Sequence, residues 1–341
     1  SESRGLGDVY KRQMIDYLND GYRGKVISFD ITNRCTNQCP ACMRQHWDYK
    51  TSHIPGKDMT LEEFDDITNY FGAVDFNGSV GDPVSHPKLP EILELAHKKN
   101  IEVNISTAVS SKPIEFYRRC FNANPKARWI FGIDGTPEVS FVHRINQDGE
   151  YLFEVMKEAT KIMQEEIIWQ YIVFSYNEDR IEKAKQMAKE IGVVFKLNHT
   201  KRFGKQEWLK PNNDVYAEKQ KEYETKFQPK CLNRQRDPFV NTQKQVLPCC
   251  WLESPYTTPD EEEFMEGHLK PLTDKSLNLK NNKIKNIVNS KIWKNFFDIL
   301  TKTPDEAPNY CKERCSTSMR SFSRTTTYYK PDGTISTPDN S

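Results

Sequence analysis

Residues 30–45, with the sequence DITNRCTNQCPACMRQ, carry three cysteines in the spacing C-x3-C-x2-C. These cysteines are Cys35, Cys39 and Cys42. The stretch overlaps the end of residues 25–32, a run rich in β-branched and aromatic residues that predicts a strand. Three thiolates can bind three irons of a 4Fe–4S cluster, and the fourth iron is then open to a small molecule. The stretch therefore predicts a cluster-binding loop at the end of a strand.

A zinc site is the alternative for the same loop. Structural zinc takes four donors in a closed tetrahedral arrangement. The loop offers three cysteines, and His46 or His53 could supply the fourth donor. The residues alone therefore favour the cluster and leave zinc open.

Strand and helix patterns alternate along the chain from this loop to about residue 200. Six runs rich in β-branched or aromatic residues predict strands: 25–32, 73–77, 101–106, 128–133, 167–175 and 193–198. Between them apolar residues recur with helical spacing, as at Leu89, Ile92, Leu93 and Ala96. This alternation implies right-handed crossovers and a parallel sheet. Six units are too few for a closed eightfold barrel, so we expect an α/β fold, a partial (β/α)6 TIM-like barrel with its chemistry at the C-terminal strand ends.

The composition of the 341 residues excludes several classes of protein. Lys and Arg number 49 against 48 Asp and Glu, and this near-neutral chain has no basic field for nucleic acid. The longest apolar stretch, residues 167–176, contains Gln170 and is too short to span a bilayer. No signal-peptide pattern opens the sequence. Nine cysteines are an odd number for a disulfide framework, so we expect metal or cluster ligation in the cytoplasm, with no membrane or nucleic-acid partner.

The pattern changes after residue 200 and divides the chain into five predicted parts. They are an N-terminal tail (1–24), the barrel (25–200), a linker with a helix over 214–227 (201–230), a small α+β domain (231–318) and a Ser/Thr-rich C-terminal tail (319–341). In the small domain, residues 238–250 predict a hairpin. The helical spacing of apolar residues from Ile284 to Leu300 predicts one long helix.

Four further cysteines gather in the small C-terminal domain: Cys231, Cys249, Cys311 and Cys315. Two thiolates from a hairpin and two from a loop after a helix can complete a tetrad, and a cluster bound by it has no vacant iron. Zinc is the alternative, because closed four-cysteine sites are common for structural zinc. Cys250 lies beside Cys249 and could replace it, whereas Cys120 is expected to be an ordinary buried thiol.

The first cysteine loop and its place after strand one of a partial barrel resemble the radical S-adenosylmethionine (SAM) superfamily. In that family the open iron chelates the amine and carboxylate of SAM. Electron transfer from the reduced cluster then cleaves SAM to a 5′-deoxyadenosyl radical, which abstracts a substrate hydrogen. One departure is Ala41, where relatives often have an aromatic residue. The resemblance implies that the cofactors are a 4Fe–4S cluster and SAM.

Later segments are similar to the family's SAM-binding loops and occur in the same order. Residues 76–89, FNGSVGDPVSHPKL, resemble a Gly-Gly-Glu-Pro loop that binds the methionyl amine, with Asp in place of Glu. Residues 104–111, NISTAVSS, and 131–138, FGIDGTPE, stand where relatives carry Thr-Asn-Gly and Ser-Ile-Asp-Gly. The resemblance implies SAM contacts from eight residues: Gly78, Gly81, Asp82, Pro83, Ser106, Asp134, Arg144 and Asn177. Taken singly, such residues also fit ordinary turns and solvated charges.

The second cysteine group resembles the twitch half of the SPASM extension, which holds one auxiliary 4Fe–4S cluster. The final pair, Cys311 and Cys315, is one residue looser than the x2 spacing of many relatives. An auxiliary cluster without a vacant iron implies electron relay or structural support. No catalytic base can be identified from the sequence.

The resemblance implies a radical SAM enzyme that modifies a peptide, a protein or a small polar metabolite. A reducing partner such as flavodoxin or ferredoxin is expected. Because only 34 residues precede Cys35, we expect either that a leader peptide needs a separate binding partner or that the substrate is not a peptide. The alternative is a non-catalytic iron–sulfur electron carrier or a zinc-stabilised binding protein, which would not need six β/α units.

Overall fold

The computed structural model describes residues 26–40, 42–200, 203, 206–213, 227, 229, 231–232, 238–256, 267–315 and 325–337. The chain divides into two compact units. The barrel unit comprises Asp30–Ile54, Phe76–Lys221 and Phe322–Ser341, and the second unit comprises Ser1–Phe29, Pro55–Asp75 and Glu222–Ser321. Residues 55–75, predicted as part of the barrel, therefore group with the C-terminal region.

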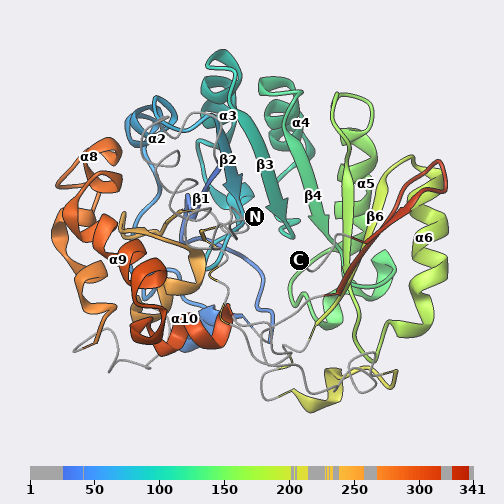
Figure 1. The fold of residues 1–341 in the computed structure, drawn as a ribbon. Coiled ribbons are helices and arrows are strands. Elements are labelled where there is room, and N and C mark those ends of the chain that lie inside the picture. The colour runs from blue at the N-terminus through green and yellow to red at the C-terminus, as the bar shows by residue number, and fades with distance from the viewer. Residues whose placement is uncertain are drawn as a thin grey trace, which may run out of the picture. The chain divides into compact units, whose positions relative to one another are not determined.

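Four parallel strands and their helices make up most of the barrel unit. The strands are β3 (Glu102–Thr107), β4 (Arg128–Gly132), β5 (Ile168–Ile172) and β6 (Val194–His199), paired in this order. The helices are α3 (Leu89–Lys98), α4 (Ile114–Ala123), α5 (Gly149–Ala159) and α6 (Ile181–Glu190). Figure 1 shows these helices on one side of the strands. The predicted α/β fold with a mostly parallel sheet is confirmed.

The core of the barrel unit is strongly aromatic. Trp129 of β4 and Trp169 of β5 have no exposed surface. Trp129 stacks on Phe131 with ring centroids 5.8 Å apart, and Trp169 meets Phe195 edge-on at 5.6 Å. Large rings packed in this way contribute both buried apolar area and specific geometry. They give the strands a rigid interior, and the site loops begin where these strands end.

Residues 325–337 form a β-hairpin in the barrel unit. The strand β9 (Thr325–Tyr329) pairs antiparallel with β6, and β10 (Ile335–Ser336) pairs antiparallel with β9. The prediction of a loose tail over 319–341 is therefore wrong for these residues. The composition hid two local signals: the run Thr-Thr-Thr-Tyr-Tyr favours a strand, and the Pro-Asp-Gly sequence at 331–333 favours a turn.

The strands of the second unit follow the order β2-β1-β7-β8. They are β1 (Val26–Phe29), β2 (Ala73–Phe76), β7 (Phe239–Val240) and β8 (Val246–Leu247). The strands β7 and β8 are antiparallel, which confirms the predicted hairpin over 238–250. The strand β7 also pairs in parallel with β1, through Ser28 with Phe239 and Phe29 with Val240. The sequence pattern did not predict this pairing.

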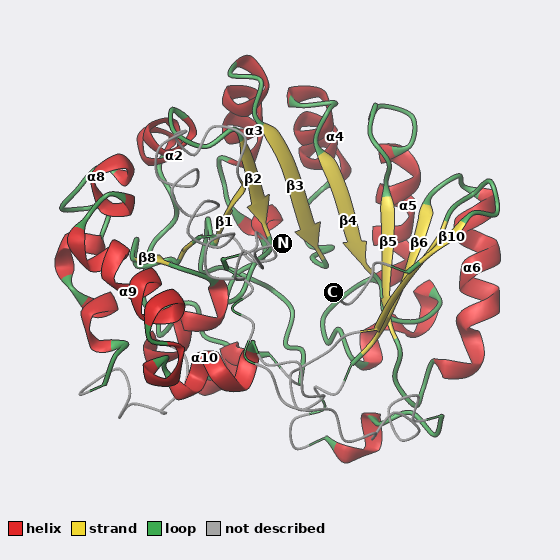
Figure 2. Cartoon of the chain, in the orientation of Figure 1, coloured by secondary structure: helices red, strands yellow, loops and turns green. Residues whose placement is uncertain are grey.

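The helices of the second unit are α2 (Leu61–Thr68), α8 (Ile284–Val288), α9 (Lys291–Lys302) and α10 (Asn309–Arg314). Figure 2 shows α8 and α9 as separate helices, so the prediction of one helix from 284 to 300 is wrong. The second helix has its own N-cap, because Ser290 Oγ accepts from Trp293 N at 3.2 Å. The predicted helix over 214–227 lies outside the described residues except for Phe227, and so does the predicted tail 1–24.

Short 3-10 helices connect the main elements. They are η1 (Met43–Trp47), η2 (Pro83–Ser85), η3 (Pro137–Val142), η4 (Glu178–Arg180), η5 (Glu207–Leu209), η7 (Cys250–Tyr256), η8 (Lys270–Thr273), η9 (Lys275–Leu277) and η10 (Pro304–Glu306). Those after β1, β2 and β4 lie among the predicted site residues. Within the described ranges, every helix is too short or too polar to cross a bilayer.

Candidate functional site

The cysteine loop of the barrel unit is wound tightly by its own backbone. The amide of Cys42 donates to the carbonyl oxygen of Cys39 at 3.0 Å, and η1 begins directly after Cys42. Tyr49 Oη donates to the same carbonyl oxygen at 2.9 Å. Cys35, Cys39 and Cys42 are half-buried, and none forms a disulfide. One loop thus presents three reduced thiols.

Two guanidinium groups act on these thiols. Burial raises the pKa of Cys35, Cys39 and Cys42. Arg44 lowers the pKa of Cys35 and Cys42 in opposition to burial. Arg144 likewise lowers the pKa of Cys39 in opposition to burial, and Arg144 Nη1 donates to Cys39 Sγ at 3.9 Å. Metals bind the thiolate form, so both cations favour the form that is needed for ligation.

The glycine loop, residues 78–83 after β2, is bonded to the cysteine loop. The amide of Asp82 donates to the carbonyl oxygen of Arg34 at 2.8 Å. A Cβ on Gly81 would lie 1.8 Å from Thr32 O, so only glycine fits there. Gly78 has a φ of +65°, a conformation that favours glycine. Both predicted glycines are therefore required by the backbone that joins these two loops.

Asp30 follows β1 directly and organises the glycine loop. Its carboxylate accepts from Ser79 N at 2.5 Å and from Val80 N at 3.0 Å. Burial raises the pKa of Asp30 to about 7, although both N–H donors favour the ionised form. The sequence analysis did not single out Asp30. Its position at the end of a predicted buried strand was the available signal.

The carboxylate of Asp82 is buried and satisfied by the chain itself. It accepts from Val84 N at 3.0 Å, from Ala108 N at 2.8 Å and from the hydroxyl of the last residue of β3 at 2.8 Å. Burial raises its pKa despite these donors. Asp82 thus holds the end of β3, the strand in which Ser106 lies, next to Pro83 at the start of η2. The SAM contacts of these residues stay predictions.

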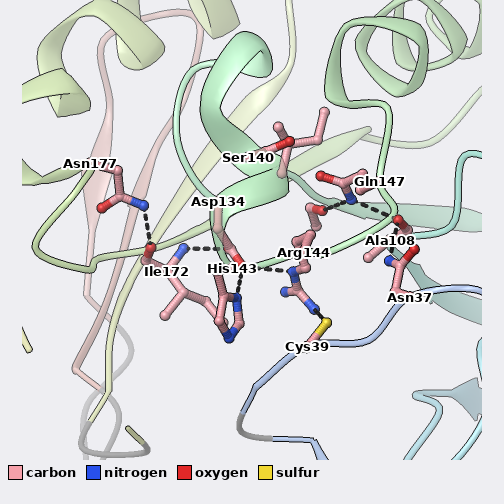
Figure 3. Close-up of polar contacts among 12 residues, drawn as sticks. Asn37, Cys39, Ala108, Asp134, Ser140, His143, Arg144, Gln147, Ile172 and Asn177 are labelled. Atoms are coloured by element: carbon pink, nitrogen blue, oxygen red, sulfur yellow. Dashed lines mark hydrogen bonds and ion pairs between the residues drawn. The ribbon is translucent and has the colours of Figure 1, made fainter. Parts of the chain in front are cut away.

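Asp134, directly after Ile133 at the end of β4, is fully buried and binds Arg144. Its Oδ2 accepts from Arg144 Nε at 2.6 Å and lies 3.0 Å from His143 Nδ1. Figure 3 shows Arg144 between Asp134 and Cys39. Burial alone would raise the pKa of Asp134, but Arg144 and His143 outweigh it and lower the pKa. Arg144 therefore joins the predicted Asp134 to the cysteine loop.

His143 is a buried residue of this site that the sequence analysis missed. Burial lowers its pKa, in opposition to Asp134, so the ring is neutral at pH 7. The neutral ring carries its proton on Nδ1, because Nδ1 faces the Asp134 carboxylate, and the other nitrogen points away (Figure 3). The ring also packs on Phe174, with centroids 4.2 Å apart. Only its neighbour Arg144 was singled out from the sequence.

Two amide side chains, also missed, tie the cysteine loop to the strand ends. Asn37 Nδ2 donates to Ala108 O at 2.8 Å, and Gln147 Nε2 donates to the same oxygen at 2.6 Å (Figure 3). In the described part of the chain, the buried oxygens Asn37 Oδ1 and Gln147 Oε1 have no hydrogen-bond partner. A buried acceptor without a donor is unfavourable. These two oxygens therefore suit a bound molecule that carries N–H or O–H groups.

Asn177, predicted to line the cavity, holds the turn after β5. It is fully buried. Its Nδ2 donates to Ile172 O at 3.0 Å, and its Oδ1 accepts from Phe174 N at 2.7 Å. Both ends of the amide are used by the local backbone, and its SAM contact stays a prediction.

The C-terminal cysteines lie on three segments of the second unit: Cys231 in a turn, Cys249 and Cys250 after β8, and Cys311 and Cys315 in and after α10. All five are half-buried, and none forms a disulfide. Burial raises the pKa of Cys231, and the thiols of Cys249 and Cys315 raise it further. Burial likewise raises the pKa of Cys249 to about 12, with help from Cys250 and Cys315. Thiols from the three segments are thus close enough to influence one another.

Neither cysteine group has the arrangement of an assembled metal site. Across the residues that the structure covers, no set of three or more His, Cys, Asp or Glu side chains is placed to hold a metal ion.

Parallel β/α units with a C-x3-C-x2-C loop after the first strand define the class of radical SAM enzymes. The sequence profile of the Radical SAM superfamily matches residues 29–193. This stretch of the chain is a radical SAM domain. The superfamily implies a 4Fe–4S cluster and SAM as cofactors.

The chain is similar to the tungsten-containing aldehyde ferredoxin oxidoreductase cofactor-modifying protein of Pyrococcus furiosus, with 27% identity over 84 residues. This match covers 24% of the chain and 23% of the relative, so it spans about a quarter of that protein. Among solved structures, this chain is similar to Streptococcus suis SuiB, with a TM-score of 0.55 and 8% identity. The match covers 83% of this chain and 70% of the SuiB chain.

Two further structures of SuiB, bound to SAM and to the precursor peptide SuiA, each match with a TM-score of 0.55 and 9% identity. The match to the SAM-bound structure covers 83% of this chain and 71% of the SuiB chain. The match to the peptide-bound structure covers 86% of this chain and 74% of the SuiB chain. At these identities the likeness shows a shared fold, which is the partial barrel of radical SAM enzymes.

The residues present fit both implied cofactors. Three thiols in one loop, with Arg44 and Arg144 beside them, suit an anionic iron–sulfur cluster. The unpartnered oxygens of Asn37 and Gln147 suit the ammonium or hydroxyl donors of SAM. Both sets belong to the barrel unit.

Proposed function

We propose that Cys35, Cys39 and Cys42 bind the SAM-cleaving cluster and that the enzyme modifies a peptide or protein. One observation carries the cluster assignment: three loops of one unit are bonded around these thiols. Arg144 joins the Asp134 loop to Cys39, and Asp82 N joins the glycine loop to the cysteine loop. When bound, the cluster and SAM supply one-electron reduction, cleavage of SAM and removal of a substrate hydrogen.

The remaining predicted residues hold and orient SAM in this proposal. Gly78 and Gly81 keep the glycine loop thin enough for its backbone to approach the methionyl group. The Asp134–Arg144 pair orients the cofactor next to the cysteine loop. The other four residues shape the loops that line the site: Asp82, Pro83, Ser106 and Asn177.

A peptide substrate is supported by the fold comparison. SuiB, which shares the fold, has been solved with its precursor peptide bound. Its structure spans most of this chain, including regions beyond the radical SAM profile. We therefore place a peptide first and a small polar metabolite second among the substrates to test.

The second cysteine group is proposed to hold one auxiliary 4Fe–4S cluster, bound by Cys231, Cys249, Cys311 and Cys315. The electrostatic influence among Cys231, Cys249 and Cys315 supports this assignment. A cluster with four protein ligands has no vacant iron, so its role is electron relay or structural support. In this proposal residues 231–318 form the auxiliary domain, 201–230 form the linker, and a flavodoxin or ferredoxin supplies electrons.

Anaerobic purification and reconstitution test both cluster assignments. We expect about eight irons per chain, and 5′-deoxyadenosine should form when dithionite and SAM are added. Iron without 5′-deoxyadenosine would contradict the SAM-cleaving assignment. Zinc at the second group, detected by metal analysis of the same sample, would contradict the auxiliary cluster.

Isotope transfer tests the substrate class. A deuterated peptide pool and a deuterated pool of small polar metabolites are each incubated with the reconstituted enzyme, SAM and dithionite. We expect deuterium in 5′-deoxyadenosine from the peptide pool, because the abstracted hydrogen ends on that product. Deuterium from the metabolite pool alone would overturn the peptide assignment.

A further inference from the structure

Arg44 is a buried cation of the cysteine loop, two residues after Cys42. Its side chain is 1% exposed. Its guanidinium donates to Asn33 O (2.6 Å), Val80 O (2.6 Å), Cys35 O (3.3 Å), Tyr49 O (3.1 Å) and Thr51 Oγ1 (3.1 Å). These acceptors lie on both sides of the cysteine loop and in the glycine loop. Arg44 therefore fixes the two loops against each other.

All the acceptors of Arg44 are uncharged. In the described ranges Arg44 takes part in no ion pair, and its Nε is buried without a partner. Two other cations differ: the half-buried Arg144 lies 2.6 Å from Asp134, and the buried Lys244 lies 3.1 Å from Glu63. Burial of a cation without an opposite charge is strongly unfavourable. No ion pair in the described ranges therefore balances this guanidinium.

The missing negative charge corresponds to the ligands of the neighbouring cluster. Arg44 follows Cys42 by two residues, and its Nη2 donates to the carbonyl oxygen of Cys35 at 3.3 Å. Only thiolates bind the metal, so ligation brings negative charge to the side of the loop that Arg44 faces. Arg144 is less available for this role, because its own charge is already balanced by Asp134.

We propose that Arg44 supplies the positive charge that balances the thiolate-bound cluster while its hydrogen bonds fix the cysteine loop to the glycine loop. This inference rests on the proposed cluster site. Net charge and hydrogen bonding around an iron–sulfur cluster set its reduction potential. The fixed charge of Arg44 therefore makes the cluster easier to reduce. Arg44 is a positioning residue, because it contacts the loop backbone and not SAM.

The test compares Arg44→Gln and Arg44→Lys with the wild-type enzyme after anaerobic reconstitution. Lys50→Gln, which removes an exposed charge from the same loop, is the matched control. One readout is the iron content. The other is the ratio of reduced to oxidised cluster at one fixed solution potential, measured by EPR on the signal that responds to added SAM. We expect this ratio to fall about tenfold in Arg44→Gln, or about 59 mV for one electron. Arg44→Lys keeps the charge, so its ratio should stay within about threefold of wild type.

Each outcome decides the proposal. An Arg44→Gln enzyme with the wild-type ratio would overturn it, and so would an Arg44→Lys ratio that falls as far as that of the Gln variant. If Arg44→Gln does not fold, Arg44→Lys decides alone by the same threefold limit. A wild-type chain without iron at the cysteine loop would instead refute the proposed function, whereas normal iron with an unchanged ratio refutes only the role of Arg44.

Discussion

The two cysteine groups differ in what surrounds their thiols. In the cysteine loop, Arg44 and Arg144 oppose the effect of burial on the pKa values of the thiols. In the second unit, neighbouring thiols add to the effect of burial on Cys231 and Cys249. Thiols also act on one another in the first group, where Cys39 raises the pKa of Cys35 and Cys42 raises that of Cys39. The two groups therefore differ in the cations, which lie beside the thiols of the first group.

This difference matches two kinds of cluster site. Three thiols in one loop leave one iron of the cluster without a protein ligand, and cations beside them favour a cluster that must be reduced during turnover. Thiols from three separate segments can close around a metal and join those segments. If the contrast is real, one substitution should affect one group and spare the other.

Cys39→Ala should have the largest effect. Two thiols remain in the cysteine loop, and they are too few to hold the SAM-cleaving cluster. We expect 5′-deoxyadenosine formation to fall to background while about four of eight irons stay bound at the second group. Cys120→Ser, outside both groups, is the control and should retain iron and turnover. Normal 5′-deoxyadenosine formation in Cys39→Ala would contradict the assignment of the two groups.

Cys249→Ala should affect the second group alone. We expect a loss of about half the iron, cleavage of SAM within about tenfold of wild type, and loss of product formation. Cys250→Ala is the matched comparison, because it removes the adjacent thiol. Iron retained in Cys250→Ala assigns the ligand to Cys249. Iron lost in Cys250→Ala and retained in Cys249→Ala would reverse the assignment.

Much of the fold could be predicted because its signals are local. Each strand from β3 to β6 has its own run of β-branched or aromatic residues, and the hairpin of β7 and β8 is closed by a short turn. The partners of β9 and β7 are not local properties. Tyr329 pairs with Phe195 of β6, and Phe239 pairs with Ser28 of β1. No pattern within a short window specifies such a partner.

The site residues also divide into those with a local sequence signal and those whose partners are distant in sequence. The cysteine loop could be predicted because its three thiols lie within one short motif. Asp134 and Arg144 came only from the family resemblance. Asn37 was missed because its role depends on a loop that is distant in sequence, and Arg44 because its acceptor Val80 O lies 36 positions away. Asn37 Nδ2, for example, contacts Ala108 O across 71 positions.

Gly81→Ala should have a smaller effect than loss of a ligand, and again on one group. The added methyl would lie 1.8 Å from Thr32 O, so the glycine loop must move away from the cysteine loop. Overpacking of this kind costs about 1–3 kcal/mol. We expect Tm to fall by roughly 5 °C and iron to be lost mainly from the first group. Ser79→Ala changes the same loop without this clash and is the control, and equal iron loss from both groups would contradict the prediction.

Asp30, which holds the glycine loop, should give the smallest effect, a pH dependence of stability. Its pKa is about 7 in the folded chain, against the model-compound value of 3.8. Between these values the folded chain holds a proton that the unfolded chain has released. The carboxyl therefore stabilises the fold most below pH 3.8, and this contribution is lost as the pH rises through 7. From about pH 5.5 to about pH 8 the loss is about 2 kcal/mol.

Asp30→Asn separates this titration from the hydrogen bonds of the same side chain. The two bonds from Ser79 N and Val80 N use the two oxygens of the carboxylate, and the amide of Asn has only one oxygen. The variant therefore loses one of these bonds and is less stable at every pH. The decisive quantity is therefore the slope of the unfolding free energy against pH, measured with guanidinium under anaerobic conditions. Wild type should lose more stability than the variant between about pH 5.5 and about pH 8, because only wild type releases this proton on unfolding. Parallel slopes would show that Asp30 is already ionised in the folded chain and would contradict this prediction.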